Sequence, residues 1–128
     1  MNAIVNYLIH LVLAAVLLVV FFKAYTWLTP YDEVTLIRQG NHAAAFSLGG
    51  AMLGFSLTIA SSILHTNTVE QFMGWAAGAM VVQALGYAVT TRCLKMSQDQ
   101  IEADNSAFGG LLGTISLSIG GINAACIS

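Results

Sequence analysis

A few side chains in this sequence are of the types that bind metals or act in catalysis, and their spacing decides whether they could do so. His10, His65 and Glu70 fall near the same end of the predicted helices and could be imagined as metal ligands. Their spacing fits no recognised ligand motif. Serines are plentiful, but none is paired with a histidine and an acid at a spacing typical of a hydrolase. We therefore expect no metal site, no cofactor and no enzymatic activity.

Two amides lie within long apolar segments, which are predicted below to cross a membrane. Gln83 lies near the middle of one long apolar segment, and Asn123 lies in the outer half of another. Buried amides in lipid usually hydrogen bond to a neighbouring helix, at about 0.6 to 2 kcal/mol each. They can also line a polar pathway through the membrane. We favour the structural role, and the sequence leaves both interpretations open.

Two asparagines occupy matching places in the two halves of the chain. Asn41 follows LIRQG and Asn105 follows QIEAD, 64 positions later. One interpretation is that each caps the start of a helix by accepting a hydrogen bond from a backbone N–H. The other is that they form a shared polar site between the halves. We favour the caps, and both interpretations stay open.

The elements that must position these residues are membrane helices. The 128-residue chain is 57% hydrophobic and 8% charged, whereas soluble domains carry about 25% charged residues. Four segments exceed the length of about 20 residues that a helix needs to cross the hydrocarbon core: Ala3–Leu28, Asn41–Leu64, Val69–Leu94 and Asn105–Ser128. We predict one all-α integral membrane domain over residues 1–128, with the lipid bilayer as its surroundings. The net charge of −2 argues against a nucleic-acid partner.

The four basic residues predict the orientation of the chain. Lys23 and Arg38 flank the first connection, and Arg92 and Lys95 flank the third. Lys and Arg near the ends of membrane helices are retained in the cytoplasm. We therefore expect both of these connections inside the cell and both termini outside.

The sequence also predicts two copies of one unit, over about residues 1–64 and 69–128. At an offset of 64, Leu48 and Gly49 align with Leu112 and Gly113, along with other apolar pairs. Each copy contributes two spans, so the copies enter the membrane in the same direction. We predict two helical hairpins related as a parallel repeat. In the first connection, Thr29 and Asp32 have the spacing of a capping box, and we expect Thr29 to cap a short helix.

Glycines predict which spans pack closely. Gly50 with Gly54 and Gly109 with Gly113 each have the small-xxx-small spacing that lets helix backbones approach in lipid. This spacing serves contacts within the chain and between copies equally well, so it does not count subunits. The small and apolar faces of these helices lead us to expect a homo-oligomer.

Three stretches carry a resemblance to a known family: IRQGNHAAAFSLGGAMLGFSLTIASS after an acidic residue, VVQALGY, and the closing SIGGINAACIS. Over nearly the whole chain they resemble the domain of unknown function 350 family, the YjfL-like bacterial inner-membrane proteins. The resemblance implies four helices built from two copies of one unit, with no agreed activity. The residues that match are Glu33, Arg38, Gly40, Asn41, Ala43, Gln83, Asn105, Ala107 and Asn123. Asp104 stands where the first copy has Gly40, so the two copies are not equivalent at that turn.

The resemblance also implies a setting. Genes of this family neighbour those for phage-shock-protein-A-like membrane-remodelling proteins and ATP-grasp ligases, which implies envelope stress or membrane maintenance. In a bacterium the expected orientation makes the protein a multi-pass inner-membrane protein with both termini in the periplasm.

Two functions of different classes follow. The first is a self-associating membrane scaffold that presents its short cytoplasmic connections, with Glu33, Arg38 and Glu102, to a membrane-remodelling partner. The alternative is an oligomeric channel or small passive transporter with Gln83 and Asn123 along its route. None of the six acids lies deep in a span, which argues against proton-coupled transport. We favour the scaffold.

Overall fold

The computed structural model describes residues 2–29, 31–94 and 97–127, which form six helices. Four are long: α1 (Ala3–Leu28), α3 (His42–His65), α4 (Val69–Leu94) and α6 (Ser106–Cys126). Two are short: α2 (Glu33–Arg38) and α5 (Ser97–Glu102). Each long helix is apolar enough to cross a membrane, so the predicted all-helical class and the four spans are confirmed. Lys95, on which the orientation partly rests, lies outside the described residues.

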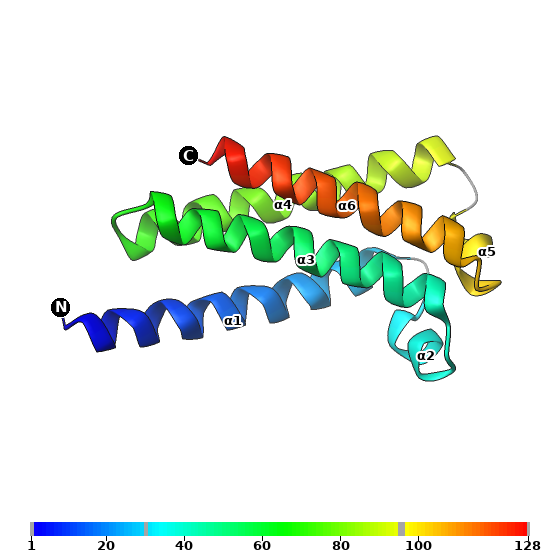
Figure 1. The fold of residues 1–128 in the computed structure, drawn as a ribbon, viewed down its shortest axis with the longest axis horizontal. Helices are drawn as coiled ribbons and strands as arrows, with labels where there is room; N and C mark the ends of the chain where they lie inside the picture. Colours follow the sequence, from blue (N-terminus) through cyan, green and yellow to red (C-terminus); the bar gives the residue numbers. More distant parts are fainter. Residues whose placement is uncertain (1, 30, 95–96, 128) are drawn as a thin grey trace.

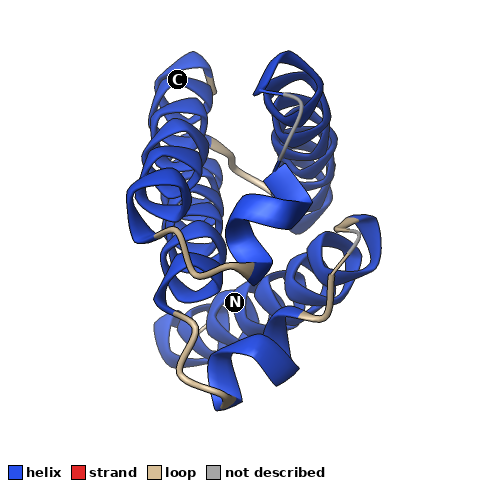
Figure 2. Ribbon diagram, turned by 90° about the vertical axis from the view of Figure 1, so that its right-hand side faces the viewer, coloured by secondary structure: helices blue, strands red, loops and turns tan. Residues whose placement is uncertain are grey.

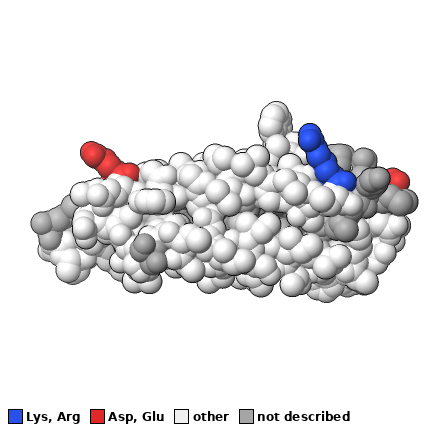
Figure 3. Space-filling model, turned by 90° about the horizontal axis from the view of Figure 1, so that it is seen from above, with Lys and Arg blue, Asp and Glu red and all other residues white. Residues whose placement is uncertain are grey.

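The long helices run side by side, with α2 and α5 at one end of the bundle and both chain termini at the other (Figure 1). Figure 2 looks onto the end that carries the two short helices. On the face shown in Figure 3, charged side chains lie near the two ends, with a long uncharged stretch between them. A membrane-spanning bundle requires this distribution, because charge is costly inside the hydrocarbon.

Helix α3 is the centre of the bundle and contacts α1, α4 and α6. In its most apolar window 56% of the residues are buried, against 11% for α1. Among the described helices, the approach of α3 to α6 is the closest. A Cβ added at Gly50 would collide with the backbone of Gly113, and one added at Gly54 would lie 2.6 Å from the Ser116 carbonyl oxygen. Only glycine lets the two backbones meet at these points.

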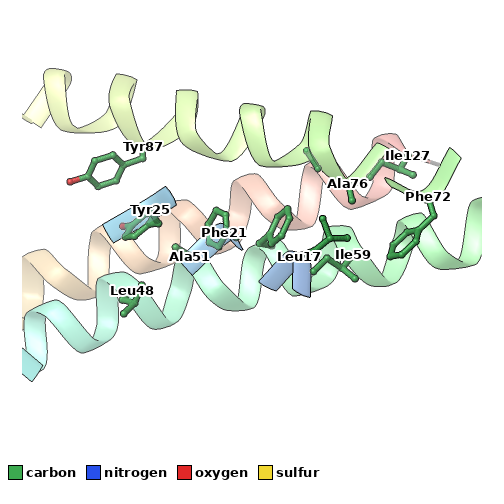
Figure 4. Packing of buried hydrophobic residues seen from close by; sticks show 12 residues of the cluster. Leu17, Phe21, Tyr25, Leu48, Ala51, Ile59, Phe72, Ala76, Tyr87 and Ile127 are labelled. Carbon is green, nitrogen blue, oxygen red and sulfur yellow. The ribbon is translucent and has the colours of Figure 1, made fainter. Parts of the chain in front are cut away.

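One face of α1 packs on α3 and α4. Leu17, Phe21 and Tyr25 are buried along this face. The ring of Phe21 stacks on Phe55 of α3 with centroids 4.5 Å apart, and Figure 4 shows the aromatic side chains of the core between the helices. The other faces of α1 are exposed aliphatic surface, which in a membrane is the surface that lipid requires.

Helices α3 and α6 begin in the same way. Asn41 Oδ1 accepts a hydrogen bond from the Ala44 N–H at 2.8 Å, and Asn105 Oδ1 accepts one from the Phe108 N–H at 3.2 Å. Both asparagines therefore are N-caps. The residue before each has a positive φ, 86° at Gly40 and 57° at Asp104. Glycine adopts this conformation freely, and aspartate is among the few other residues that tolerate it.

The cap of α2 differs from the prediction. Asp32, not Thr29, is its N-cap, and Asp32 Oδ1 accepts a hydrogen bond from the Thr35 N–H at 3.2 Å. The helix begins at Glu33, one residue after Asp32, so Thr29 is too far back along the chain to cap it. The Thr29 hydroxyl instead binds the side chain of Glu33.

Candidate functional site

Glu33 is the most unusual polar residue of the structure. It opens α2, and its side chain is 0% exposed. The Thr29 hydroxyl donates a hydrogen bond to Glu33 Oε1, whereas Oε2 has no hydrogen-bond partner among the described residues. The expectation that Glu33 belongs to an exposed partner surface is therefore wrong. The short helix turns its Glu33 face inward and leaves the apolar Val34 and Ile37 exposed.

Three tyrosines surround this end of the bundle core. Tyr25 of α1 and Tyr87 of α4 meet edge to face, with ring centroids 5.1 Å apart, and the hydroxyls of Tyr25 and Ser47 lie 3.2 Å apart. Tyr31 lies in the connection between α1 and α2 and is also buried. The hydroxyls of Tyr31 and Tyr87 have no hydrogen-bond partner among the described residues. We call the set the acid–tyrosine cluster: Tyr25, Thr29, Tyr31, Glu33, Ser47 and Tyr87.

Burial changes the proton affinity of this cluster. It raises the pKa of Glu33 to about 7; the hydrogen bond from Thr29 opposes the shift, and the nearby charge of Asp32 adds to it. Burial also raises the pKa of Tyr31, and the charge of Glu33 contributes to that shift. A carboxyl group that titrates near neutral pH among hydroxyl groups can bind and release a proton reversibly.

A hollow of about 500 Å³ lies beside the cluster at the end of α1. Thr29, Tyr31 and Glu33 contribute to its wall, together with the exposed side chains of Lys23 and Asp32. The hollow gives the buried carboxyl a neighbouring space that opens at the molecular surface. The charged groups on its rim, Lys23 and Asp32, carry both signs of charge.

A second set of contacts joins the two halves of the chain at the same end. The Asn41 side chain donates from Nδ2 to the Ile101 carbonyl oxygen at 2.7 Å. The Ala43 N–H donates to Asp104 Oδ1 at 3.0 Å, and His42 lies 3.6 Å from the same carboxylate. These bonds cross from the start of α3 to the turn before α6. They fix α5 and its turn to the first half of the chain.

Asn105 behaves differently from Asn41. Its Nδ2 donates to Gln100 Oε1 at 2.6 Å, within its own connection, and its side chain is exposed. The two asparagines therefore serve separate contacts, and the structure does not bring them into one polar site. Only Asn41 reaches the other half of the chain.

The two deep amides both tie α4 to α6. Gln83 Nε2 donates to the Ser116 carbonyl oxygen at 2.8 Å, and Asn123 Nδ2 donates to the Ala79 carbonyl oxygen at 3.3 Å. Gln83 is buried, and its Oε1 has no partner among the described residues. Within one copy of the chain, these amides hold helices together.

His10, His65 and Glu70, considered for a metal site, do not form a group of ligands among the described residues. His10 Nδ1 lies 2.8 Å from the Asn6 carbonyl oxygen, and His65 Nδ1 lies 2.9 Å from that of Ser61, so each ring is bonded within its own helix. Among residues 2–29, 31–94 and 97–127, no group of three or more His, Cys, Asp or Glu could hold a metal ion.

Sequence reasoning missed the acid–tyrosine cluster. Tyr25, Thr29 and Glu33 follow one another at intervals of four, which in a continuous helix would place them on one face. The helix ends at Leu28, however, and α2 begins only at Glu33. The spacing was therefore a signal, but the fold uses a turn rather than a helix to bring Thr29 and Glu33 together.

Comparison with known proteins places the chain in a family. The family model described as Domain of Unknown Function (DUF350) matches residues 1–127. The UPF0719 inner membrane protein YjfL of Escherichia coli K12 is 29% identical over 112 residues, covering 88% of this chain and 85% of the relative. The UPF0719 transmembrane protein YshE of Bacillus subtilis is 30% identical over 129 residues, covering 98% and 96%. No solved structure matches. With its four spanning helices, the chain is a small polytopic inner-membrane protein that belongs to the DUF350 family.

Proposed function

We propose that this protein is a self-associating membrane scaffold without enzymatic activity, which presents α2, α5 and their turns to a cytoplasmic partner in envelope maintenance or stress. The observation that carries the proposal is the fixing of both connections to one another by the bonds from Asn41 to Ile101 and from Ala43 to Asp104. These bonds make one rigid end from two separate segments. A rigid, charged end on a membrane bundle is suited to recognition.

The presented surface differs from the one expected from sequence. Arg38 and Glu102 are exposed, as is Asp32, whereas Glu33 is buried and leaves the set. The surface therefore carries both signs of charge on two short helices. A surface of this size would bind weakly alone, so several copies side by side would strengthen the binding through avidity.

A duplicated hairpin is part of the proposal. The bounds of α2 and α5 differ by 64 positions at both ends, and α3 and α6 start 64 positions apart. The positive φ angles at Gly40 and Asp104 and the caps at Asn41 and Asn105 keep the same separation. These agreements support a parallel repeat with a connecting turn that has the same backbone path in both copies.

The orientation is also proposed. The α2 and α5 end lies opposite both termini (Figure 1), as four spans require. The basic residues Lys23, Arg38 and Arg92 belong to this end of the chain's helices, which supports a cytoplasmic position for it and a periplasmic position for the termini.

The second candidate is a passive channel built from several copies. One observation favours it: Gln83 Oε1 is buried without a partner among the described residues. A polar oxygen in that position is costly unless something binds it. The donors of Gln83 and Asn123 are engaged between α4 and α6, so a route would have to form between copies rather than through one.

Photocrosslinking tests the scaffold. A benzophenone amino acid in place of Arg38 or Glu102 should crosslink to a cytoplasmic protein in cells, and one in place of the exposed Glu70 at the far end should not. A third probe replaces the exposed Asp32 with the same benzophenone amino acid. The charge-neutralising variant R38Q with E102Q should reduce crosslinking from this probe, while E70Q should leave it unchanged. If the neutralised variant crosslinks as strongly as the wild type, the recognition surface is elsewhere and the scaffold proposal fails.

Liposome flux tests the channel. Purified protein in sealed vesicles should not dissipate an imposed K⁺ or Cl⁻ gradient faster than protein-free vesicles. A protein-dependent flux that Q83L or N123L abolishes would favour the channel instead.

A further inference from the structure

The contact between α3 and α6 uses different faces of the two helices. The inner faces are defined by backbone contact: on α3 they consist of Ala43, Phe46, Gly50 and Gly54, and on α6 of Gly109, Gly113, Ser116 and Gly120. Phe46 takes part through its backbone, and the residue is 50% exposed. At the proposed repeat offset of 64, neither set is the equivalent of the other. The two halves of the chain therefore meet through two different faces and not through equivalent ones. Such a contact is called heterologous, or head to tail.

The repeat equivalents of these inner faces are open. The equivalents of the α3 inner face lie on α6 and are called here the outer face of α6: Ala107, Gly110, Thr114 and Ser118. The equivalents of the α6 inner face lie on α3 and are called the outer face of α3: Ala45, Gly49, Met52 and Ser56. All eight residues are partly or fully exposed, and Met52 among them also packs against the core cluster that includes Phe21 and Phe55.

The repeat-related glycines Gly113 and Gly49 show the difference between an inner and an outer face. A Cβ added at Gly113 would collide with the carbonyl oxygen of Phe46, because the backbone of α3 lies directly against it. A Cβ added at its equivalent, Gly49, would meet nothing within 4 Å. The equivalent of Phe46 is Gly110, where an added Cβ also meets nothing within 4 Å. Each helix thus has a surface suited to a close helix partner that the chain itself does not supply.

Apart from Met52, the residues of the two outer faces are small enough to let the helices meet closely. The Thr114 hydroxyl donates to the Gly110 carbonyl oxygen and the Ser118 hydroxyl to that of Thr114, each at 2.8 Å, so these hydroxyls are satisfied within α6. The Ser56 hydroxyl donates to the Met52 carbonyl oxygen at 2.8 Å. Close packing of small residues is a main source of helix association in lipid.

We infer that a second copy of the chain docks head to tail, with the outer face of α6 of one copy on the outer face of α3 of the next. The contact repeats the one that joins α3 and α6 within the chain. It specifies the surface for the self-association in the proposed function and rests on that proposal. A groove of about 330 Å³, bordered by Ala45, Gly49, Gly110 and Thr114, continues from the internal contact along both faces.

Helix α4 shows where the neighbouring parts would lie. It packs against both α3 and α6, whereas α1 packs against α3 and α4. The head-to-tail contact places α6 of the next copy beside α3, where it would give α1 a third neighbour, as α4 already has in α1, α3 and α6. This fits the low burial of α1, at 11% of its apolar window. Because head-to-tail contacts do not pair off, they generate a closed ring or an open row in the membrane plane.

Cysteine crosslinking tests the arrangement. In a background with Cys93 and Cys126 changed to serine, A45C and A107C are expressed separately and together in native membranes and oxidised with copper phenanthroline. Ala43 and Gly109 touch within the chain, and Ala107 and Ala45 are their equivalents. Co-expressed single variants should give a dimer band, each alone should give none, and the double variant should give a ladder or a closed oligomer. G78C, on an exposed position of α4, is the control for random collision.

The outcomes separate this inference from the proposal on which it rests. A dimer band from A45C or A107C alone would mean that identical faces meet, which overturns the head-to-tail contact. If the mixture gives no band although native mass spectrometry in nanodiscs shows an oligomer, self-association uses another surface and only this inference fails. A monomeric mass would overturn both.

A steric variant gives a second measurement. Gly49→Leu places a large side chain where the isolated chain has room, so the fold should be kept while the neighbouring α6 is excluded. The native mass should fall to that of one chain. Gly78→Leu, at an equally open exposed glycine of α4, should leave the oligomer unchanged. An unchanged oligomer in Gly49→Leu would overturn the inference.

Discussion

The Asn41 side chain bonds to the backbone of Ile101, 60 residues away in the sequence, with 2.7 Å between its Nδ2 and the carbonyl oxygen. Its Oδ1 at the same time caps α3 through the Ala44 N–H. One amide thus starts a membrane helix and holds the second connection against it. Ile101 itself is fully buried, which makes this bond the centre of the junction between the halves.

Asn41→Ala should be more harmful than Asn105→Ala. Both substitutions remove a helix cap, which costs about 1 kcal/mol. Asn41→Ala also removes the buried bond to the Ile101 carbonyl oxygen, which keeps its bond from the Asp104 N–H, and this adds about 1 kcal/mol, whereas Asn105 is exposed. Reversible unfolding in mixed detergent micelles measures both. Equal losses for the two variants would show that the bond to Ile101 contributes nothing.

The stability of the protein should fall as the pH rises through neutrality. Folding raises the pKa of Glu33 from 4.5 to about 7, so the folded state binds more protons between these values. The stability present below pH 4.5 is lost as the pH rises to about 7 and above. Since one pKa unit corresponds to about 1.4 kcal/mol, the loss is of the order of 3 kcal/mol. Glu33→Gln should abolish this dependence, while Glu70→Gln should retain it. Parallel pH curves for Glu33→Gln and the wild type would contradict the assignment.

Thr29→Val should raise the pKa of Glu33 further. The Thr29 hydroxyl binds Oε1 of the carboxylate and lowers its pKa against the effect of burial. Removing this donor disfavours the charged form. The protonated carboxyl stretch in infrared difference spectra, absent in Glu33→Gln, gives the titration directly. A midpoint that stays in place or moves down would exclude the role of Thr29.

Gly54→Ala should destabilise the bundle by about 1 to 3 kcal/mol through overpacking. The added Cβ would lie 2.6 Å from the Ser116 carbonyl oxygen, and a backbone group cannot move aside cheaply. Gly78→Ala is the matched control, because its Cβ meets nothing within 4 Å. It should be neutral or slightly stabilising, since alanine favours helix over glycine. Unfolding of both variants under the same conditions decides the point.

Gln83→Leu should cost little. It removes the bond to the Ser116 carbonyl oxygen, and such bonds between membrane helices contribute about 0.6 kcal/mol on average. It also removes the buried Oε1 that lacks a partner among the described residues, which offsets part of the loss. A loss of stability above about 2 kcal/mol would mean that the Gln83 side chain has a further partner besides the Ser116 carbonyl oxygen.

The features that could be predicted from sequence are those that depend on local chemistry. Apolar length predicts the four spans, and the short polar side chains of Asn41 and Asn105 predict caps because they act on N–H groups three residues away. Glycine spacing indicates the close faces of α3 and α6. The partner of each cap lies within one turn of the asparagine, whereas the glycine spacing indicates which faces pack closely but not which helix they meet.

The features that could not be predicted depend on where separate segments meet. Glu33 is predicted to be a surface charge because it lies beside Asp32 in a short connection between spans. Its burial depends on how this connection folds against Tyr31 and the tyrosines of α1 and α4. The choice of Asp32 as the cap of α2 follows from the turn after Leu28, which no spacing rule fixes. The separate roles of Asn41 and Asn105 arise because only one of them faces the other half of the chain.

The unequal burial of the spans also sets an order of assembly during synthesis. Helix α1 is the most apolar span, with a mean hydropathy of 2.6, and the least buried, so it can settle in lipid as soon as it leaves the ribosome. Helix α3 has a mean hydropathy of 1.6 and its closest partner is α6, which is made last. Until then its glycine-lined face has only lipid, or the insertion machinery, beside it. Newly made chains that already carry α3 but still lack α6 are the forms most in need of such protection.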